Sequence, residues 1–139
     1  MKKNKKQLRE LFEIAERARE SSYSPYSGIS VGAALLTASG KVYVGANIEN
    51  SSYTPTVCAE RTAIFRAVLD GERDFAAIAI SGGRRGESAT DSFYPCGVCR
   101  QVMSEFFSPD TVIVNGKGGD IECHSFAELL PAAFTKDKL

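Results

Sequence analysis

The 139-residue sequence contains no tryptophan, a single histidine and no net formal charge, because 17 lysines and arginines balance 17 aspartates and glutamates. A broad positive field for nucleic acid or anionic lipid is therefore not expected, although Lys2, Lys3, Lys5 and Lys6 form one basic run. No apolar stretch approaches the roughly 20 residues that cross a bilayer, and no signal-type apolar region follows the lysines. We expect a cytoplasmic protein with no nucleic-acid or membrane partner.

What is present fits a globular protein: 43% of the residues are hydrophobic and 24% are charged. The length suits one domain over residues 1–139, and the sequence has no internal repeat, low-complexity tract or interdomain linker. The four cysteines are the unusual feature. In the cytoplasm, cysteines more often serve metal binding or catalysis than disulfide bonds.

Hydrophobic periodicity predicts alternating helices and strands. An apolar stripe at helical spacing predicts a first helix over about 6–20, and two strands joined at Ser39-Gly40 follow within 29–50. Further helices are predicted near 58–71, 96–107 and 125–134, and further strands near 75–83, 111–116 and 120–125. Strand–helix–strand alternation favours a three-layer α/β/α domain, here with a mixed five-stranded sheet.

The second of the paired strands alternates cleanly over 42–49. This alternation predicts that Asn47 and Glu49 project from the same face near its C-terminal end. Two polar groups placed in this way could form hydrogen bonds to sugar hydroxyls.

The cysteines lie at predicted helix starts. Cys58 begins one helix, and Cys96 and Cys99 lie at the start of another. Helix N-termini stabilise thiolates, and three thiolates can supply three corners of a zinc tetrahedron. A structural zinc site would need Cys123 or His124 as its fourth ligand, whereas a catalytic site would leave that corner to water. A redox pair formed by Cys96 and Cys99 is a third interpretation.

Two charged residues favour the catalytic interpretation. Glu60 follows Cys58 within the first helical turn, where a carboxylate could approach a reacting water without binding the metal. Arg61, three residues after Cys58, lies on the same side of the helix as that thiolate. Hydrogen bonds from Arg61 to sulfur would offset the negative charge of three thiolates and support metal binding.

The segment "CAERTA", followed further along by "PCGVCRQ", resembles the zinc nucleoside deaminases in the three-cysteine form of the small cytidine deaminases. The resemblance extends over nearly the whole chain, including the segment from "SPYSG" through "CAERTAIFRAV" and the tail "ELLPAAF". It implies the cytidine-deaminase-like fold, one zinc ion per chain held by Cys58, Cys96 and Cys99, and water as the fourth ligand. The combined pattern is far more specific than a CxxC pair alone.

The resemblance also implies a reaction, the hydrolysis of cytidine and deoxycytidine to uridine and deoxyuridine with release of ammonia, as in pyrimidine salvage. Zinc lowers the pKa of a bound water toward about 7 and so makes hydroxide available. Glu60 matches the residue that takes a proton from this water and delivers it to N3 of the pyrimidine as C4 is attacked. The same carboxyl then helps to protonate the departing ammonia.

Substrate-binding roles follow from the same resemblance. Asn47 and Glu49, in "NIEN", match ribose-binding residues, and the backbone N–H of Ala59 is expected to bind the carbonyl of the base. Tyr53 and Phe134 match residues that complete the pocket of a neighbouring subunit. The implied assembly is a homotetramer with shared active sites.

One position departs from the family pattern. Ile29 stands where the family usually has an aromatic residue, which puts the affinity for the base in question because isoleucine offers no π face. Alternatives therefore remain: a deaminase of another aminopyrimidine nucleoside such as blasticidin S, although "NIEN" argues against it, or a non-catalytic structural zinc module.

The loop from Gly83 to Tyr94 is long enough to be functional or mobile.

Overall fold

The computed structural model describes residues 4–89 and 91–139. Lys2 and Lys3 of the basic run, and Thr90 of the loop from Gly83 to Tyr94, lie outside these ranges. The elements follow in the order α1 (Lys5–Ala18), η1 (Arg19–Ser21), β1 (Ile29–Thr37), β2 (Val42–Ala46), α2 (Ala59–Leu69), β3 (Phe75–Arg84), α3 (Gly97–Phe106), β4 (Val112–Lys117), β5 (Asp120–Ser125), α4 (Phe126–Leu129) and η2 (Lys136–Lys138).

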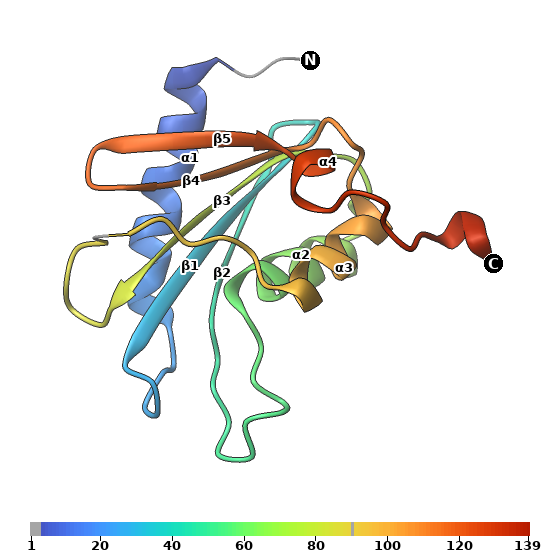
Figure 1. The fold of residues 1–139 in the computed structure, drawn as a ribbon. Helices are drawn as coiled ribbons and strands as arrows, with labels where there is room; N and C mark the ends of the chain where they lie inside the picture. Colours follow the sequence, from blue (N-terminus) through green and yellow to red (C-terminus); the bar gives the residue numbers. More distant parts are fainter. Residues whose placement is uncertain (1–3, 90) are drawn as a thin grey trace.

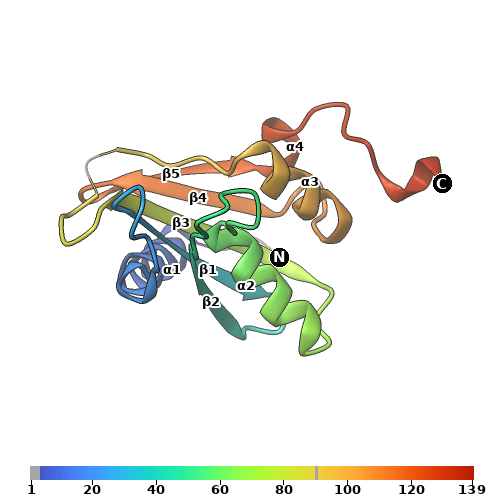
Figure 2. The same cartoon turned by 90° about the horizontal axis from the view of Figure 1, so that it is seen from below.

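The strands form one five-stranded sheet in the order β2-β1-β3-β4-β5, with β3 and β4 parallel and the other pairs antiparallel. Helix α1 covers one face, and α2 and α3 cover the other (Figures 1 and 2). The predicted three-layer α/β/α architecture with a mixed sheet is therefore confirmed. No helix in the described part of the chain is long and apolar enough to cross a membrane.

Asn4 is the N-cap of helix α1: its Oδ1 accepts a hydrogen bond from the Gln7 N–H at 2.8 Å, and the Asn4 N–H donates to Gln7 Oε1 at 3.3 Å. This reciprocal capping satisfies N–H groups that a helix start leaves free. The apolar stripe packs against small residues of the sheet, which include Ala34, Ala77 and Ala79. The first helix is thus formed by the residues that its sequence pattern predicted.

Helix α2 lies unusually close to the sheet. Its buried face is built from the small residues Ala59, Ala63 and Ala67. Opposite them, Gly45 of β2 has no side chain, and a Cβ there would collide with the backbone of Ala59 and Ala63. Because glycine permits this close approach, the N-terminus of α2, which carries the first cysteine, is fixed against the sheet.

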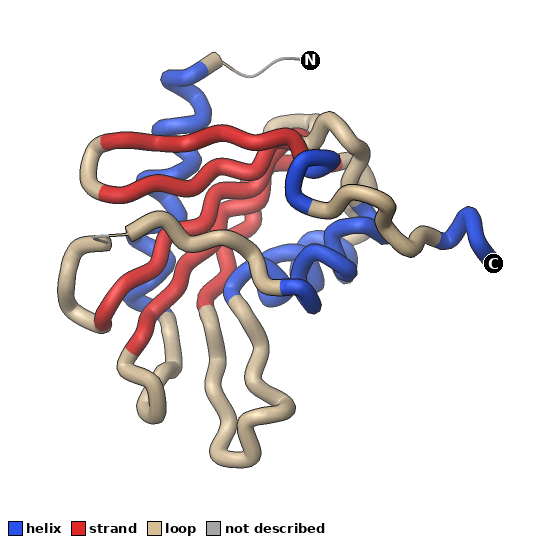
Figure 3. The backbone as a smooth tube through the Cα atoms, viewed as in Figure 1, coloured by secondary structure: helices blue, strands red, loops and turns tan. Residues whose placement is uncertain are grey.

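Strand β2 ends at Ala46 and does not continue to Glu49 as predicted. The reason is a side chain: Asn47 Oδ1 accepts the hydrogen bond of Val31 N–H at 2.9 Å, so it replaces a carbonyl of the ladder. Beyond it, residues 47–57 form a long loop that projects past the end of the sheet (Figure 3). Ile48 makes isolated bridges to Tyr23, before β1, and to Val57, at the far end of the loop.

The last predicted helix is much shorter than expected. Helix α4 covers only Phe126–Leu129, although Ser125 caps it with the same reciprocal pattern seen at α1. Pro131 disfavours helical backbone at Leu130, whose φ and ψ are −146° and 73°. The remaining tail leaves the body of the molecule (Figure 1).

Candidate metal centre and active site

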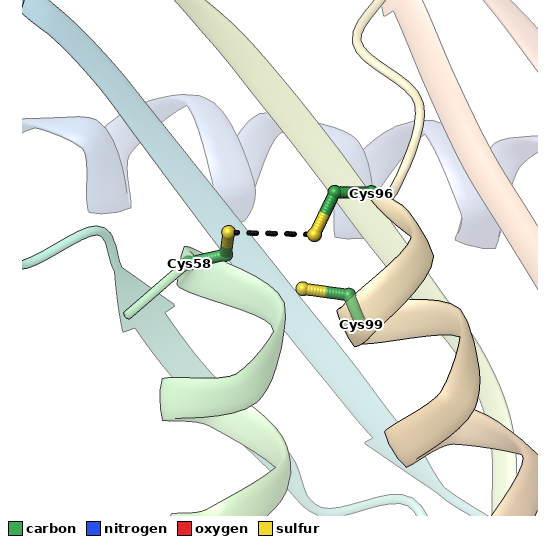
Figure 4. Close-up of side chains that lie close together, drawn as sticks. All are labelled: Cys58, Cys96 and Cys99. Carbon is green, nitrogen blue, oxygen red and sulfur yellow. Dashed lines mark hydrogen bonds between the residues drawn. The ribbon is translucent and has the colours of Figure 1, made fainter. Parts of the chain in front are cut away.

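Three cysteines from two helix ends converge in front of the sheet (Figure 4). Cys58 and Cys96 are the N-cap residues of α2 and α3, both with extended backbone and with no side-chain capping bond. Cys99 follows one turn later in α3 and is fully buried. Because an N-cap side chain can project beyond the end of its helix, the thiols of Cys58 and Cys96 can both point toward that of Cys99.

The geometry of the three sulfur atoms suits zinc. Their Sγ atoms all lie within 4.8 Å of one another, and those of Cys58 and Cys96 are 3.8 Å apart. Ligands at about 2.3 Å from a tetrahedral zinc ion would be separated by about 3.8 Å. The residues present therefore fit this metal, as the sequence pattern predicted.

Neither candidate for a fourth protein ligand joins this group. Among the described residues, the only cluster of three or more potential ligands is the one formed by Cys58, Cys96 and Cys99. His124 instead lies beside Glu122, with Nε2 and Oε2 3.6 Å apart, and its ring is 5.6 Å from that of Tyr94. A closed structural tetrahedron using His124 or Cys123 is not formed.

Hydrogen bonds favour thiolate at this site. The bond from Cys99 lowers the pKa of the Cys58 thiol to about 5, and Arg61 contributes through its Nη2, which donates to Cys58 Sγ at 3.4 Å. The same hydrogen bond raises the pKa of Cys99, the thiol that donates it, because it stabilises the protonated form of Cys99. Arg61 thus makes the contact with sulfur that its position in the sequence predicted.

Glu60 is a buried carboxyl beside the sulfur cluster. Its side chain is 3% exposed. Burial raises its pKa to about 7, and the negative charge of Cys58 adds to the effect, while a hydrogen bond from its own backbone N–H opposes it. A carboxyl with such a pKa can both accept and release a proton near neutral pH.

Asn47 and Glu49 come from the same segment, but their side chains are held differently. The Asn47 amide is buried: its Oδ1 accepts from Ser22 Oγ at 2.6 Å, and its Nδ2 donates to the carbonyl of Ile29 at 2.9 Å. The Glu49 carboxylate instead accepts from the backbone N–H of Tyr26 at 2.9 Å. These bonds couple both predicted sugar-binding residues to the loop that precedes β1.

Glu49 lines a surface pocket of about 350 Å³ together with Tyr26, Ser27, Tyr53 and Thr56. Ser27 holds the carboxylate through both its N–H, at 3.1 Å, and its hydroxyl. The rings of Tyr26 and Tyr53 meet edge to face at 6.1 Å. Tyr26 and Ser27 are not among the predicted site residues, although both lie in the segment "SPYSG" that shares the family resemblance.

The remaining predicted residues are spread along the chain. Ala59 is the first residue of α2, where backbone N–H groups have no partner within the helix. Ile29 begins β1 and is half-buried. Phe134 lies in the C-terminal tail with its side chain 60% exposed, and its carbonyl accepts a hydrogen bond from Gln101. Within one chain, therefore, Phe134 is not enclosed by a pocket.

A family model described as the cytidine and deoxycytidylate deaminase zinc-binding region matches residues 5–115. The chain belongs to this family. A cytidine deaminase from Sporosarcina psychrophila is 47% identical over 133 residues, which cover 95% of this chain and 94% of the relative. A crystal structure of cytidine deaminase from Burkholderia pseudomallei is 48% identical, has a TM-score of 0.82, and is matched over 90% of this chain and 97% of that one.

A second relative supports the same assignment: a cytidine deaminase from Halalkalibacterium halodurans is 48% identical over 130 residues, 93% of this chain and 95% of the relative. The predicted membership of the small cytidine deaminase family is thus confirmed. The family model concerns a zinc-binding region, and the three clustered thiols are the group that could hold the ion. Zinc is therefore the cofactor of this chain, as predicted.

Proposed function

We propose that this chain, acting as a single domain, hydrolyses cytidine and deoxycytidine to uridine and deoxyuridine and releases ammonia. The observation that carries the proposal is the convergence of three thiols within 4.8 Å beside a carboxyl that is 3% exposed. A purely structural zinc site would require a fourth protein ligand and would not require a buried carboxyl beside the three thiols. A redox pair would not require Cys58 or Glu60.

Cys58, Cys96 and Cys99 would hold the zinc ion. Zinc, when bound, supplies hydroxide near neutral pH. Glu60 would take up the proton of the attacking water and deliver it to N3 of the pyrimidine as C4 is attacked. The resulting carboxylate would then take the proton of the new C4 hydroxyl and deliver it to the amino group, which leaves as ammonia while the C4 carbonyl forms; its raised pKa supports both steps.

Two neighbouring groups would prepare the site. Arg61, which donates to Cys58 Sγ at 3.4 Å, would balance the negative charge of three thiolates and help retain the metal. The N–H of Ala59, at the first position of α2, would donate to the carbonyl oxygen of the base. Both roles follow from residues at the same helix end.

The sugar would lie toward the loop after β2. Glu49, which lines the pocket of about 350 Å³, would accept hydrogen bonds from sugar hydroxyls. The Asn47 amide is hydrogen-bonded to Ser22 through its Oδ1 and to the carbonyl of Ile29 through its Nδ2. The second N–H of that Nδ2 would donate to the sugar. Recognition of the sugar would make nucleosides better substrates than the free base.

The assembly would be a homotetramer with shared sites, located in the cytoplasm and serving pyrimidine salvage. Tyr53 supports this assembly: it lies in the projecting loop, is 70% exposed, and has a φ of 64°, which is uncommon for a bulky residue. Phe134 is similarly exposed in the tail. Both side chains would reach the pocket of a neighbouring subunit.

The test is ammonia release by the purified protein from cytidine, deoxycytidine and cytosine, with zinc quantified in the same preparation. We expect turnover of both nucleosides, much slower turnover of cytosine, and about one zinc ion per chain. Bound zinc without turnover of any of the three would reject the proposed substrates. Blasticidin S would then be assayed, since Ile29 leaves the base-binding surface open to question.

A further inference from the structure

An aromatic side chain that the proposed reaction does not use lies across the active-site face of the sheet. The segment 91–95 crosses the sheet on its way to α3 (Figure 1). Phe93, in this segment, is half-buried and packs against the core beneath α2 and α3, as Cys58 does. Only three positions separate Phe93 from Cys96.

A glycine makes room for this ring. Gly82 of β3 has no side chain, and a Cβ built on it would lie 2.5, 2.6 and 2.8 Å from three ring atoms of Phe93. The ring therefore rests directly on the backbone of the sheet. Alanine at position 82 would force it away, so the glycine fixes the height of the ring above the strand.

The position of Gly82 in the sheet brings the ring level with the proposed substrate-binding residues. Gly82 pairs with Val31 of β1, and Val31 accepts a hydrogen bond from the N–H of Asn47 at 3.2 Å. One row across the sheet thus runs from Asn47 through Val31 to Gly82, with Phe93 above its end. Ile29, two residues before Val31, faces the same side of the sheet.

The backbone that carries the ring is anchored from below. Asn115 of β4 is fully buried, and its Nδ2 donates to the carbonyl of Phe93 at 3.3 Å. Pro95, two residues later, is also buried. A residue held by a buried amide on one side and by a proline on the other is preorganised, which lowers the entropic cost of using it to bind a ligand.

We propose that Phe93 forms the aromatic wall against which the pyrimidine base packs. The inference rests on the proposed deamination, because it assigns the base to this end of the row and the sugar to the end near Asn47. A planar pyrimidine gains most from a planar aromatic partner, and Ile29 on the same face supplies apolar area without a π system. Phe93 would thereby set the affinity for the base and the preference for flat aminopyrimidines.

The absence of tryptophan from the chain allows a direct test. Phe93→Trp introduces a single fluorophore at the proposed wall, and Phe65→Trp introduces one on α2, where the phenylalanine is 49% exposed, as the matched control. Each variant is titrated with uridine, the expected product. We expect saturable quenching for Phe93→Trp and no change for Phe65→Trp.

Kinetics of Phe93→Leu and Phe93→Tyr provide a second readout. Base–aromatic stacking strengths predict that Phe93→Leu raises the KM for cytidine roughly 5- to 100-fold, with a smaller change in kcat. Phe93→Tyr should stay close to the wild-type KM, because it keeps the ring. A merely structural role would not separate these two variants in this way when their melting temperatures match.

The outcomes distinguish this inference from the proposed function. Wild-type turnover with an unchanged KM in Phe93→Leu, and no quenching in Phe93→Trp, would overturn the role of Phe93 and leave the deaminase intact. Absence of wild-type turnover would reject the proposed substrates, and uridine quenching would still decide whether the ring contacts a pyrimidine. If Phe93→Trp fails to fold, the comparison of leucine with tyrosine decides.

Discussion

Glu60 and Arg61 follow Cys58 directly in the chain, yet they contribute different chemistry. Glu60 is buried and has its pKa raised to about 7, whereas Arg61 donates to sulfur. Position in the first turn of α2 explains the difference, because adjacent helical residues point about 100° apart. Substitutions at the two positions should therefore separate proton transfer from metal retention.

Replacing Glu60 with glutamine removes the proton carrier and keeps the shape of the side chain. We expect kcat for cytidine to fall by about 10²- to 10⁴-fold, as for loss of general acid–base catalysis. Zinc content and melting temperature should stay close to those of the wild type. Turnover near the wild-type level, measured as ammonia release, would exclude Glu60 as the proton carrier.

Replacing Arg61 with alanine removes the donor to Cys58 Sγ. Losing such a partner of a metal ligand typically costs about 10- to 100-fold in metal affinity, so we expect zinc to be lost to a competing chelator at correspondingly lower concentration. Arg66→Ala, at an exposed position one turn later in α2, is the control. Equal zinc retention in the two variants would remove the proposed role of Arg61.

At the residue scale, the sequence predicted the cluster of three thiols but only part of its surroundings. Cys58, Cys96 and Cys99 could be identified because metal ligation needs particular atoms at helix starts. Ser27 and Phe93 could not, because their contacts depend on how the turn 24–28 meets Glu49 and how the segment 91–95 crosses the sheet. Spacing along the chain carries no signal for that crossing.

At the scale of elements, the close packing of α2 on β2 connects fold to function. Gly45→Ala would place a methyl group against the backbone of Ala59 and Ala63. We expect a loss of unfolding free energy of about 1–3 kcal/mol, the usual cost of overpacking, together with weaker zinc binding because Cys58 shifts with the helix. Gly119→Ala, where an added Cβ meets nothing within 4 Å, is the control for denaturant melts.

The loop before α3 is tied to β5 by a carboxylate. A hydrogen bond from the Tyr94 hydroxyl, 2.9 Å from Glu122, lowers the pKa of that carboxyl below its ordinary value of about 4.5. The unfolded chain then binds more protons than the native one at acidic pH, so this stabilisation is present above about pH 4.5 and lost below it.

Comparing the wild type with Glu122→Gln checks this sign. The wild type should melt at higher temperature than the variant at pH 7, and the gap should shrink when both are measured at pH 4. A gap that stays constant or widens on acidification would show that Glu122 does not stabilise the loop in its ionised form. Tyr94→Phe, which removes the donor, should behave like Glu122→Gln.

Element boundaries show where local sequence signals end. Helix α1 was predicted correctly because its stripe and its cap are both local features. The end of β2 was not, because the Asn47 side chain accepts the hydrogen bond of the Val31 N–H in the neighbouring strand β1, and the strand pattern of 42–49 carries no signal for that bond. Helix α4 is shorter than predicted because Pro131 interrupts the apolar run "ELLPAAF" and disfavours helical backbone at Leu130.

At the scale of the whole molecule, one chain leaves parts of the proposed site exposed. Tyr53 is 70% and Phe134 is 60% exposed, and the C-terminal tail leaves the body of the chain. Large exposed aromatic side chains of this kind are enriched at protein interfaces. Since both were predicted from family resemblance to act on neighbouring subunits, assembly and activity should be linked.

This link predicts a tetrameric mass by light scattering. Phe134→Ala should lower kcat/KM for cytidine about 10-fold or more while the melting temperature of the chain changes little, because the side chain contributes nothing to its own core. Val98→Ala, at an exposed position in α3, is the control for loss of surface apolar area. A fully active monomer would contradict shared active sites.

The central claim is that three thiols and one buried carboxyl form a catalytic zinc site. The most direct measurement removes the metal with a chelator and returns zinc in steps while ammonia release from cytidine is followed. We predict that turnover is lost with the metal and rises linearly until about one zinc ion per chain is bound. Turnover that persists in the metal-free protein would contradict the account.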